Sequence, residues 1–511
     1  MGRPNNRIVI AGGGTAGWMT AAALSQHFGS QATITLVESS SIGTIGVGEA
    51  TIPTIRNFYR RLGLQDQDVI RATQATCKLG IQFNDWHKPG SSFIHPFGMY
   101  GQDVRGIDFH QFWLKLHRQG RAAPLGEYSL GATLAAAGKF VPPSPNPPST
   151  LSVYDWALHF DAALFAQLMR DVATRQGVTA VDAVIARVSQ REDGRIAALH
   201  TECGQRVEGD LFIDCSGFRG LLIGETLGVE YQSWQQWLLC DSALAVQSES
   251  VEPPKPYTRV NAQEAGWQWR IPLQQRDGNG HVYSRQFMSD ARAEEILRAN
   301  IPGALNATST LNAEPRKIGF TPGRRARAWE NNCIAIGLSA GFLEPLESTS
   351  IALIETAIEK IKTLVTNFDF HPSVVEEFNQ TTALEYERVR DFLILHYKAS
   401  QRDDSEFWRY CRNMALPESL QHKLDLFLNS GYIVNYRWEM FHQPSWLAIF
   451  AGFDVLPENY DLRVDQFPDE QIEHSLNEMH RSLQRAVSGA PDHQQFIAEC
   501  FPAERPSEVA L

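Results

Sequence analysis

Cysteine is scarce in this sequence and is never arranged for a metal site. The seven cysteines are odd in number and widely scattered, and no two of them form a C-x-x-C pair. A zinc clip, a redox dithiol and a disulfide framework each require paired cysteines. The composition therefore predicts no metal site and a reducing compartment, for which the cytoplasm is the expected location.

Long apolar runs and an excess of positive charge are also missing. No uninterrupted apolar run reaches the ~18 residues that a membrane span needs, and the apolar stretch at 8–11 is broken by three glycines at 12–14. Lysine and arginine total 46 against 58 aspartates and glutamates, giving a formal net charge of −12. Because nucleic acid is bound by a basic surface, we expect no nucleic-acid partner, and we also expect no membrane or targeting segment.

The 511 residues have an ordinary globular balance, with 43% hydrophobic residues. Hydrophobic patterning predicts a strand at 7–11, a helix at 17–28 and a strand at 32–38. Five prolines within 139–150 predict a surface loop. The pattern then predicts a helix over 155–177, followed by short strands over 178–214 with a hairpin at 192–194.

Another apolar strand, at 333–337, leads through a loop into an expected helix at 351–364 and so repeats the strand–turn–helix order of the N-terminal segment. Beyond residue 366, long amphipathic stretches with dense aromatics predict helices (EFWRYC, YIVNYRWEMFH and SWLAIF). We therefore expect an α/β fold with two lobes. A doubly wound, Rossmann-like lobe would cover 1–365, with inserted substrate-side segments at about 79–150, and a largely helical substrate lobe would cover 366–511.

A glycine fingerprint lies between the first strand and the first helix. Gly12 permits a tight turn, Gly14 lets the backbone approach a pyrophosphate, and Gly17 lets the helix lie close to the strand. Glu38 ends the next strand, where a carboxylate accepts hydrogen bonds from ribose hydroxyls. The pattern indicates FAD or NAD rather than NADP, although a ligand-free glycine turn and a solvated acid are the plainer alternatives. The cofactor-binding candidates are Gly12, Gly14, Thr15, Ala16, Gly17 and Glu38, with Gly337 and Leu338 from the second turn.

Three further segments are ambiguous one by one. Gly266–Pro272 (GWQWRIP) places two indoles at strand spacing, Gly341–Ser350 (GFLEPLESTS) sets two acids around a proline, and Cys77–Gly80 (CKLG) holds a lysine among apolar neighbours. Paired tryptophans are usually core, an acid before a helix is usually a cap, and a lysine is usually solvated. Their functional meaning comes from their combination.

Together with the fingerprint, these segments resemble the flavin-dependent halogenases typified by the tryptophan halogenases. The motifs GxGxxG, the lysine of CKLG, WxWxIP and FLEPLEST occur in that family's order and spacing, and the resemblance covers most of the chain. It implies a flavin monooxygenase-type FAD lobe and an enzyme that uses FADH2 supplied by a separate NADH-dependent flavin reductase. With oxygen and chloride or bromide, such an enzyme forms hypohalous acid.

The resemblance also assigns roles to residues. It makes Lys78 the carrier of the halogen and Glu347 the essential acid, with Glu344 supporting the loop. Thr349 and Ser350 match the halide-binding pair, although Ser350 stands where the best-known members have glycine, which leaves the halide preference open. Trp267 and Trp269 form a wall beside the flavin.

For the substrate, the resemblance implies an electron-rich aromatic such as indole or a tryptophan-like ring. His95 and Phe97 are expected to cover one ring face and Trp446 the other, although a core role for Trp446 is equally plausible. A flavin-dependent aromatic hydroxylase and a flavin-binding protein without catalysis are the alternatives. The sequence leaves the oligomeric state open, with a homodimer as one option.

Overall fold

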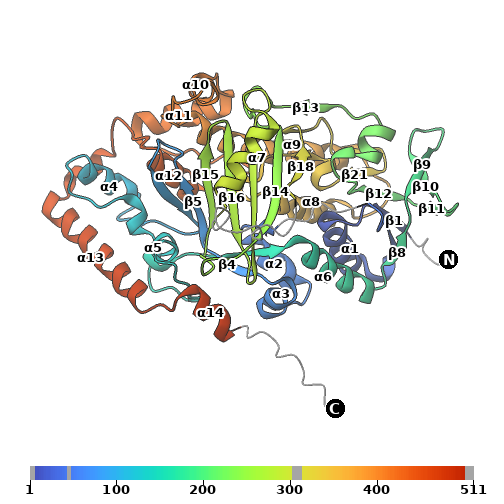
Figure 1. Cartoon of the computed structure of the whole chain (residues 1–511), viewed down its shortest axis with the longest axis horizontal. Coiled ribbons are helices and arrows are strands. Elements are labelled where there is room, and N and C mark those ends of the chain that lie inside the picture. Colours follow the sequence, from blue (N-terminus) through green and yellow to red (C-terminus); the bar gives the residue numbers. More distant parts are fainter. Residues whose placement is uncertain (1–5, 43–47, 302–313, 501–511) are drawn as a thin grey trace, which may run out of the picture. The chain divides into compact units, whose positions relative to one another are not determined.

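The computed structural model describes residues 6–42, 48–301 and 314–500, and the chain divides into two compact units (Figure 1). The first unit consists of 1–73, 160–242 and 318–390, and the second of 74–159, 243–317 and 391–511. This division differs from the expected boundary at 365/366, because the segment 243–317 belongs to the same unit as the C-terminal helices. No helix among the described residues is long and apolar enough to cross a membrane.

The first unit is built on a six-stranded sheet with the order β20-β21-β12-β1-β2-β8. Strands β21, β12, β1, β2 and β8 run parallel, and only β20 at the edge is antiparallel. The register places Ile8 opposite both Leu211 and Ile34, and the central strand β1 is buried from Ile8 to Ala11. This is the parallel α/β arrangement that the fingerprint predicts.

The strands and helices of the first unit have the following bounds: β1 Asn6–Ala11, α1 Thr15–Phe28, β2 Ala32–Glu38, β3 Gly48–Ala50, α2 Thr54–Arg61, α3 Asp66–Thr73, α6 Ala162–Arg175, β8 Thr179–Asp182, β9 Ile185–Gln190, β10 Ile196–Thr201, β11 Arg206–Glu208, β12 Leu211–Asp214, β13 Tyr231–Ser233, β19 Gly323–Arg325, β20 Trp329–Glu330, β21 Cys333–Ala335, β22 Gly341–Phe342 and α8 Ser350–Leu364. Helix α9 (Pro372–Lys398) begins in this unit and ends in the second. The expected strands at 7–11 and 32–38 and the helix at 351–364 are confirmed.

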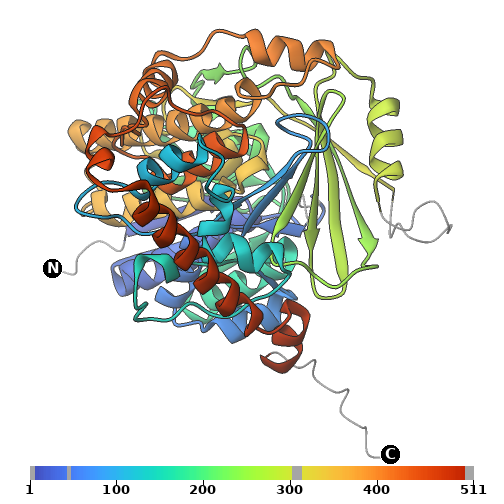
Figure 2. The ribbon, with the colours of Figure 1, turned by 90° about the vertical axis from the view of Figure 1, so that its left-hand side faces the viewer.

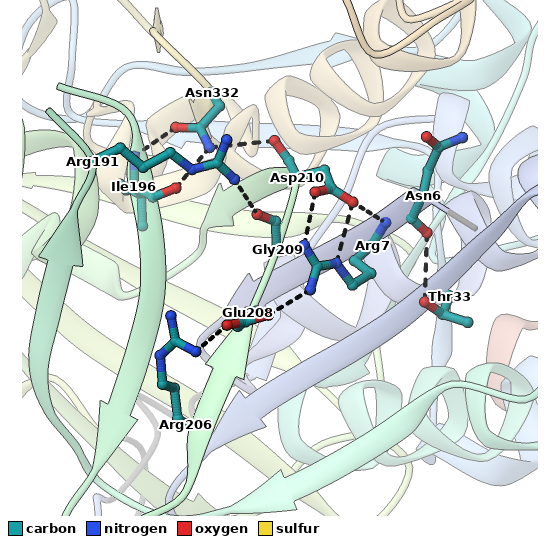
Figure 3. A network of polar contacts seen from close by, with 10 residues as sticks. All are labelled: Asn6, Arg7, Thr33, Arg191, Ile196, Arg206, Glu208, Gly209, Asp210 and Asn332. Carbon is teal, nitrogen blue, oxygen red and sulfur yellow. Dashed lines mark hydrogen bonds and ion pairs between the residues drawn. The ribbon is translucent and has the colours of Figure 1, made fainter. Parts of the chain in front are cut away.

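A small antiparallel sheet, β9-β10-β11, lies beside the parallel sheet (Figure 1) and is anchored to it by polar contacts. The guanidinium of Arg7, on β1, pairs with Glu208 at 2.8 Å and with Asp210 at 3.0 Å. The side-chain amide of Asn332 makes two hydrogen bonds to the backbone of Ile196: it donates to the carbonyl oxygen at 3.0 Å and accepts from the N–H at 2.8 Å. Figure 3 shows this network joining three segments far apart in the sequence.

The second unit holds a seven-stranded sheet with the order β18-β14-β17-β16-β15-β5-β6. Helix α7 lies against β17 (Figure 2), where His281 bonds Ala293 O at 2.9 Å. The elements of this unit are β4 Thr76–Lys78, β5 Gly80–Asn84, β6 Ser92–Pro96, α4 Phe109–His117, α5 Leu130–Ala136, β7 Ala157–Asp161, β14 Ser242–Glu249, β15 Thr258–Gln263, β16 Gly266–Pro272, β17 Arg276–Tyr283, α7 Asp290–Ala299, β18 Arg316–Gly319, α10 Glu406–Asn413, α11 Glu418–Ser430, α12 Gln443–Gly452, α13 Asp469–Ser488 and α14 His493–Cys500.

Two expectations about secondary structure are wrong. The helix expected over 155–177 begins only at Ala162, because Asp161 caps it by accepting from the N–H groups of Ala163 and Leu164, and the preceding residues form strand β7. The stretch YIVNYRWEMFH at 432–442 forms an irregular loop between α11 and α12 rather than a helix. In that loop Trp438 has a left-handed backbone with φ of 64°, which is unfavourable inside a helix.

Candidate active site

The glycine turn of the first unit connects β1 to α1 in a conformation that only glycine tolerates. Gly12 has φ of +113°, and its N–H donates to Val37 O at 2.8 Å. A Cβ atom at Gly12 would lie 2.2 Å from the carbonyl oxygen of Cys215, and one at Gly17 would lie 1.9 Å from the carbonyl oxygen of Gly12. These two glycines are therefore required by the fold itself.

Gly14 differs from its neighbours, because a Cβ atom there would have no atom of the described residues within 4 Å. It forms the N-cap of α1, and none of the side chains that the structure describes caps that end of the helix. Thr15 and Ala16 form the first turn, and the N–H groups of such a turn are the usual partners of a pyrophosphate. Gly337 lies next to this turn, since its Cβ would come 3.0 Å from that of Ala16, and Leu338 follows in a short 3-10 turn. The open space and unfilled helix end fit the ADP portion of FAD.

Glu38 ends β2 at the same edge of the sheet. Its Oε2 accepts from the indole N–H of Trp18 at 3.1 Å, and its Oε1 pairs with Arg170 at 3.0 Å. The guanidinium of Arg170 also lies over the Trp18 ring, 5.3 Å from its centroid. A carboxylate has about four acceptor sites, so these contacts orient Glu38 and still leave it the capacity to accept from ribose hydroxyls.

The segment before α8 carries the acids that the sequence singled out. Glu344 and Glu347 are each 1% exposed, and Pro345–Glu347 form a 3-10 turn. Ser348 then adopts a left-handed backbone with φ of 61°, an uncommon state for a residue other than glycine that is frequent at functional sites. This turn aims the chain into α8, which begins at Ser350.

Thr349 and Ser350 stand at the N-terminal end of α8, a 15-residue helix. Thr349 is fully buried, and its hydroxyl oxygen has no hydrogen-bond partner within the described part of the chain. A buried hydroxyl is normally paired, and a helix N-terminus carries positive partial charge. Both features fit a small anion such as halide.

In the second unit, Lys78 ends the short strand β4 and is fully buried. Its ammonium nitrogen lies 5.2 Å from the centroid of the Phe97 ring. Strand β4 pairs antiparallel with β7, so that Lys78 faces the small Ala157 and Thr76 faces His159. The lysine is therefore enclosed and in contact with one of the residues expected to bind substrate.

Trp267 and Trp269 lie on the same face of β16, as their spacing predicts. Their ring centroids are 6.0 Å apart, and the two side chains are 0% and 8% exposed. Trp269 faces Gly280 across the pair β16–β17, and a Cβ atom at Gly280 would lie 2.1 Å from the indole. A glycine on the neighbouring strand therefore seats this ring.

The residues expected to bind substrate form part of an aromatic cluster in the second unit. His95 lies 5.8 Å from Phe392 and 6.2 Å from Phe441, and those two rings stack at 4.0 Å. Trp446 joins the cluster through Phe392 at 4.9 Å. It is 1% exposed, with the ammonium of Lys423 4.1 Å from its ring centroid. Trp446 therefore packs against Phe392, and Phe392 and Phe441 are the rings next to His95.

Sequence reasoning missed several of these neighbours. His159 was hidden because the helical pattern covered residues that form β7, and Phe441 lies in the loop that was expected to be a helix. Arg170 is one arginine on an amphipathic helix, and nothing in its spacing indicates Glu38. Thr76 was missed as well, because all three residues of β4 are buried, whereas a polar–apolar–polar alternation is typical of a strand that exposes its polar side chains.

The fold and these residues indicate the class of protein. Dinucleotide-binding oxidoreductases combine a parallel sheet, a glycine turn, an acid at the end of the second strand and a helix N-terminus without a side-chain cap. The first unit has all four features. The family model described as tryptophan halogenase matches residues 7–469, and the chain belongs to this family of flavin-dependent halogenating enzymes.

Relatives extend the match over nearly the whole chain. The structure of BrvH, a flavin-dependent halogenase from Brevundimonas sp. BAL3, is similar with a TM-score of 0.93 and 56% identity, covering 98% of this chain and 99% of that one. The structure of Xcc4156, a flavin-dependent halogenase from Xanthomonas campestris, is similar with a TM-score of 0.93 and 42% identity, covering 99% and 100%. The tryptophan 6-halogenase SttH from Streptomyces toxytricini is 37% identical over 83% of this chain and 84% of its own length.

Proposed function

We propose that this halogenase acts on an electron-rich aromatic ring of the indole or tryptophan type, with reduced FAD supplied by a separate NADH-dependent reductase. Bound reduced FAD, oxygen and chloride or bromide supply the oxidised halogen as hypohalous acid. The protein holds that electrophile and the ring together. We also propose a cytoplasmic location and assembly as a homodimer.

The observation that carries this proposal is the burial of Lys78. An amine that is fully enclosed and lies 5.2 Å from the Phe97 ring can hold hypohalous acid beside an aromatic substrate and away from bulk water. A held electrophile reacts at the carbon that faces it, whereas a free one attacks any accessible ring. Lysine suits this role because its amine can act as a nucleophile, which the guanidinium of arginine cannot.

In the first unit, we assign the ADP portion of FAD to Gly12, Gly14, Thr15, Ala16, Gly17, Glu38, Gly337 and Leu338. Halide is assigned to the backbone at Thr349 and Ser350, where the N-terminus of α8 favours an anion. Glu347 orients the electrophile or accepts the proton that the ring loses as it regains aromaticity. The serine at 350 leaves chloride and bromide both open as substrates.

In the second unit, we assign the aromatic substrate to His95 and Phe97. The second ring face falls to the cluster of Phe392, Phe441 and Trp446, within which Trp446 is the residue expected from the sequence. Trp267 and Trp269 form an apolar wall that keeps the substrate away from the flavin, so that oxygen is not transferred to the ring.

A direct test offers a panel of indoles, tryptophan and phenols to the protein with FAD, a flavin reductase, NADH and either halide. Product masses should show the isotope pattern of bromine or chlorine, and omission of halide should abolish the product. A hydroxylated product that forms without halide would establish the aromatic hydroxylase instead. Oxidation of NADH with no product from any ring would favour a flavin-binding protein without catalysis.

A further inference from the structure

A buried chain of hydrogen bonds lies directly beside Lys78 in the second unit. His159 Nδ1 is 3.0 Å from Thr76 Oγ1, and His159 Nε2 is 2.9 Å from Thr258 Oγ1. Thr76 Oγ1 in turn donates to the carbonyl oxygen of Pro272 at 2.6 Å. Thr76 and His159 are fully buried and Thr258 is 4% exposed, so water does not compete for these bonds.

The chain has only one consistent direction. A threonine hydroxyl has one hydrogen, and that of Thr76 is donated to Pro272 O, which cannot donate in return. Thr76 therefore accepts from His159 Nδ1–H, and the unprotonated Nε2 accepts from the hydroxyl of Thr258. Burial lowers the pKa of His159 well below its ordinary value, and the nearby Lys78 lowers it further. The imidazole is thus neutral with its tautomer fixed.

This chain ties together the strands that carry the site residues. Thr76 and Lys78 point to the same face of β4, so His159 is the diagonal neighbour of the lysine across the β4–β7 pair. Pro272 is the last residue of β16, the strand of Trp267 and Trp269. The Thr76 hydroxyl therefore joins β4, the strand of Lys78, to β16, the strand of the two tryptophans. Thr76 lies two residues before Lys78 in the sequence.

The other edge of β4 is held by a second neutral histidine. Cys77 N–H donates to His493 Nε2 at 3.1 Å, while His493 Nδ1 bonds Pro254 O at 2.8 Å. Leu79 N–H donates to Pro256 O at 2.7 Å. A three-residue strand has few ladder bonds of its own, so its position depends on these contacts.

We propose that the hydrogen-bonded chain Thr258–His159–Thr76–Pro272 positions Lys78, and that it thereby decides whether hypohalous acid reaches the aromatic ring or escapes into solution. This inference rests on the proposed carrier role of Lys78. His159 and Thr76 are positioning residues: they act on the strand and need not touch the substrate. Disturbing them should change where the electrophile goes and should leave its formation at the flavin unchanged.

The test compares Thr76→Val with Thr76→Ser. Valine has nearly the shape of threonine without the hydroxyl, and serine keeps the hydroxyl. Each variant receives FAD, a reductase, NADH, bromide and indole, with and without a 1,3-diketone that traps free hypohalous acid. For Thr76→Val we expect bromoindole to fall about tenfold or more, as for misplacement of a reacting group, while trapped acid rises so that their sum stays within about twofold. Thr76→Ser should give the same ratio of bromoindole to trapped hypohalous acid as the unsubstituted protein.

Thr73→Val is the matched control. Thr73 is also fully buried and lies three residues earlier, but its hydroxyl donates to Val69 O within its own helix at 2.7 Å. It should leave the ratio of bromoindole to trapped acid unchanged. Thr258→Val, at the other end of the chain, should move the ratio in the same direction as Thr76→Val and provides a second probe where Thr76→Val folds poorly.

The inference is overturned if both valine variants keep the original ratio, or if Thr76→Ser loses as much bromoindole as Thr76→Val. It is also overturned if the sum of bromoindole and trapped acid falls together with the melting temperature, since that result shows a structural role only. Lys78→Ala in the same assay separates the two proposals. Regioselective bromination by Lys78→Ala contradicts the carrier role, whereas its loss together with an unchanged Thr76→Val contradicts the positioning role alone.

Discussion

Buried carboxyl groups in the first unit of this halogenase and buried imidazoles in the second have pKa values shifted in opposite directions. In the first unit, burial raises the pKa of Glu355 to about 8 and that of Glu49 to about 7. In the second unit, burial lowers the pKa of His281 and of His493 to about 4. At neutral pH Glu355 therefore largely retains its proton and Glu49 is close to half ionised, whereas the two imidazoles of the second unit have lost their protons.

The difference teaches how each unit accommodates polar groups in its interior. His493 and His281 use their neutral form to bond backbone carbonyls with one nitrogen, and His493 and His159 accept with the other. These imidazoles hold strands in place by directional bonds. In the first unit, by contrast, Gly14 has open space beside it and the buried hydroxyl of Thr349 has no partner among the described residues, and we propose that ligands bind at both positions. We therefore expect substitutions in the first unit to affect cofactor and halide, and substitutions in the second to affect the fate of the electrophile.

The largest effect should come from Lys78→Ala in the second unit. Arene halogenation should be lost, because no amine remains to hold the electrophile, while oxidation of reduced FAD and release of hypohalous acid continue. A trap assay and product analysis measure both quantities. Lys78→Arg is the matched variant: it keeps the positive charge but offers no nucleophilic amine, so it should fail as alanine does. Full activity of the arginine variant would show that charge alone suffices.

Gly14→Val tests the first unit. The added side chain has open space in the protein itself, so the variant should fold with little change in melting temperature, but it should block the approach of a pyrophosphate. We expect FAD affinity to fall by about a hundredfold or more, on the order of 3 kcal/mol, measured by fluorescence titration. Gly17→Val should instead fail to fold, because its Cβ meets the backbone of Gly12. Unchanged FAD affinity in Gly14→Val would place the dinucleotide elsewhere.

This contrast shows what local sequence determines. The β1–α1–β2 motif was predictable because hydrophobic periodicity and the glycine spacing act within 33 residues. The surroundings of Lys78 were not, because they join residues 76, 159, 258, 272 and 493 through strand pairing and side-chain bonds. The apolar residues at 156–158 and 160 fit both a helix and a buried strand, and only the cap at Asp161 shows where the helix begins. The two tryptophans were predictable by spacing, but the glycine that seats Trp269 was not.

Glu347→Gln should lower halogenation strongly, by about a hundredfold, with little change in FAD binding. The amide keeps the shape of the buried side chain but cannot accept a proton at neutral pH. Glu344→Gln, three residues earlier and equally buried, is the matched variant and should cost less activity. Steady-state rates and FAD titration of both variants measure the effect. Cofactor loss as the main defect of Glu347→Gln would make that residue structural.

Gly280→Ala tests the tryptophan wall without changing a tryptophan. The new methyl group would occupy the position of the Trp269 indole, so the ring must shift, at a cost of about 1–3 kcal/mol in stability. We expect more reduced FAD to be oxidised without halogenated product, and oxygenated product to appear. Gly319→Ala, on a strand where the methyl has open space, should leave the product ratio unchanged. If the same fraction of FAD oxidation yields halogenated product in both variants, the wall does not depend on Trp269.

The smallest effect at neutral pH, and the sharpest test of the comparison, is the pH dependence of stability in each unit. Histidines with lowered pKa stabilise the folded state above pH 6.5, and that stability is lost as the pH falls toward 4. Carboxyls with raised pKa stabilise it below about pH 4.5, and that stability is lost as the pH rises to about 8. Hydrogen exchange, corrected for the intrinsic rate, should therefore show weaker protection of the second unit at pH 5 and of the first at pH 8. Glu355→Gln should flatten the profile of the first unit alone. The exposed Glu377→Gln, on α9 of the same unit, should leave that profile unchanged. Parallel pH profiles in the two units would remove the distinction.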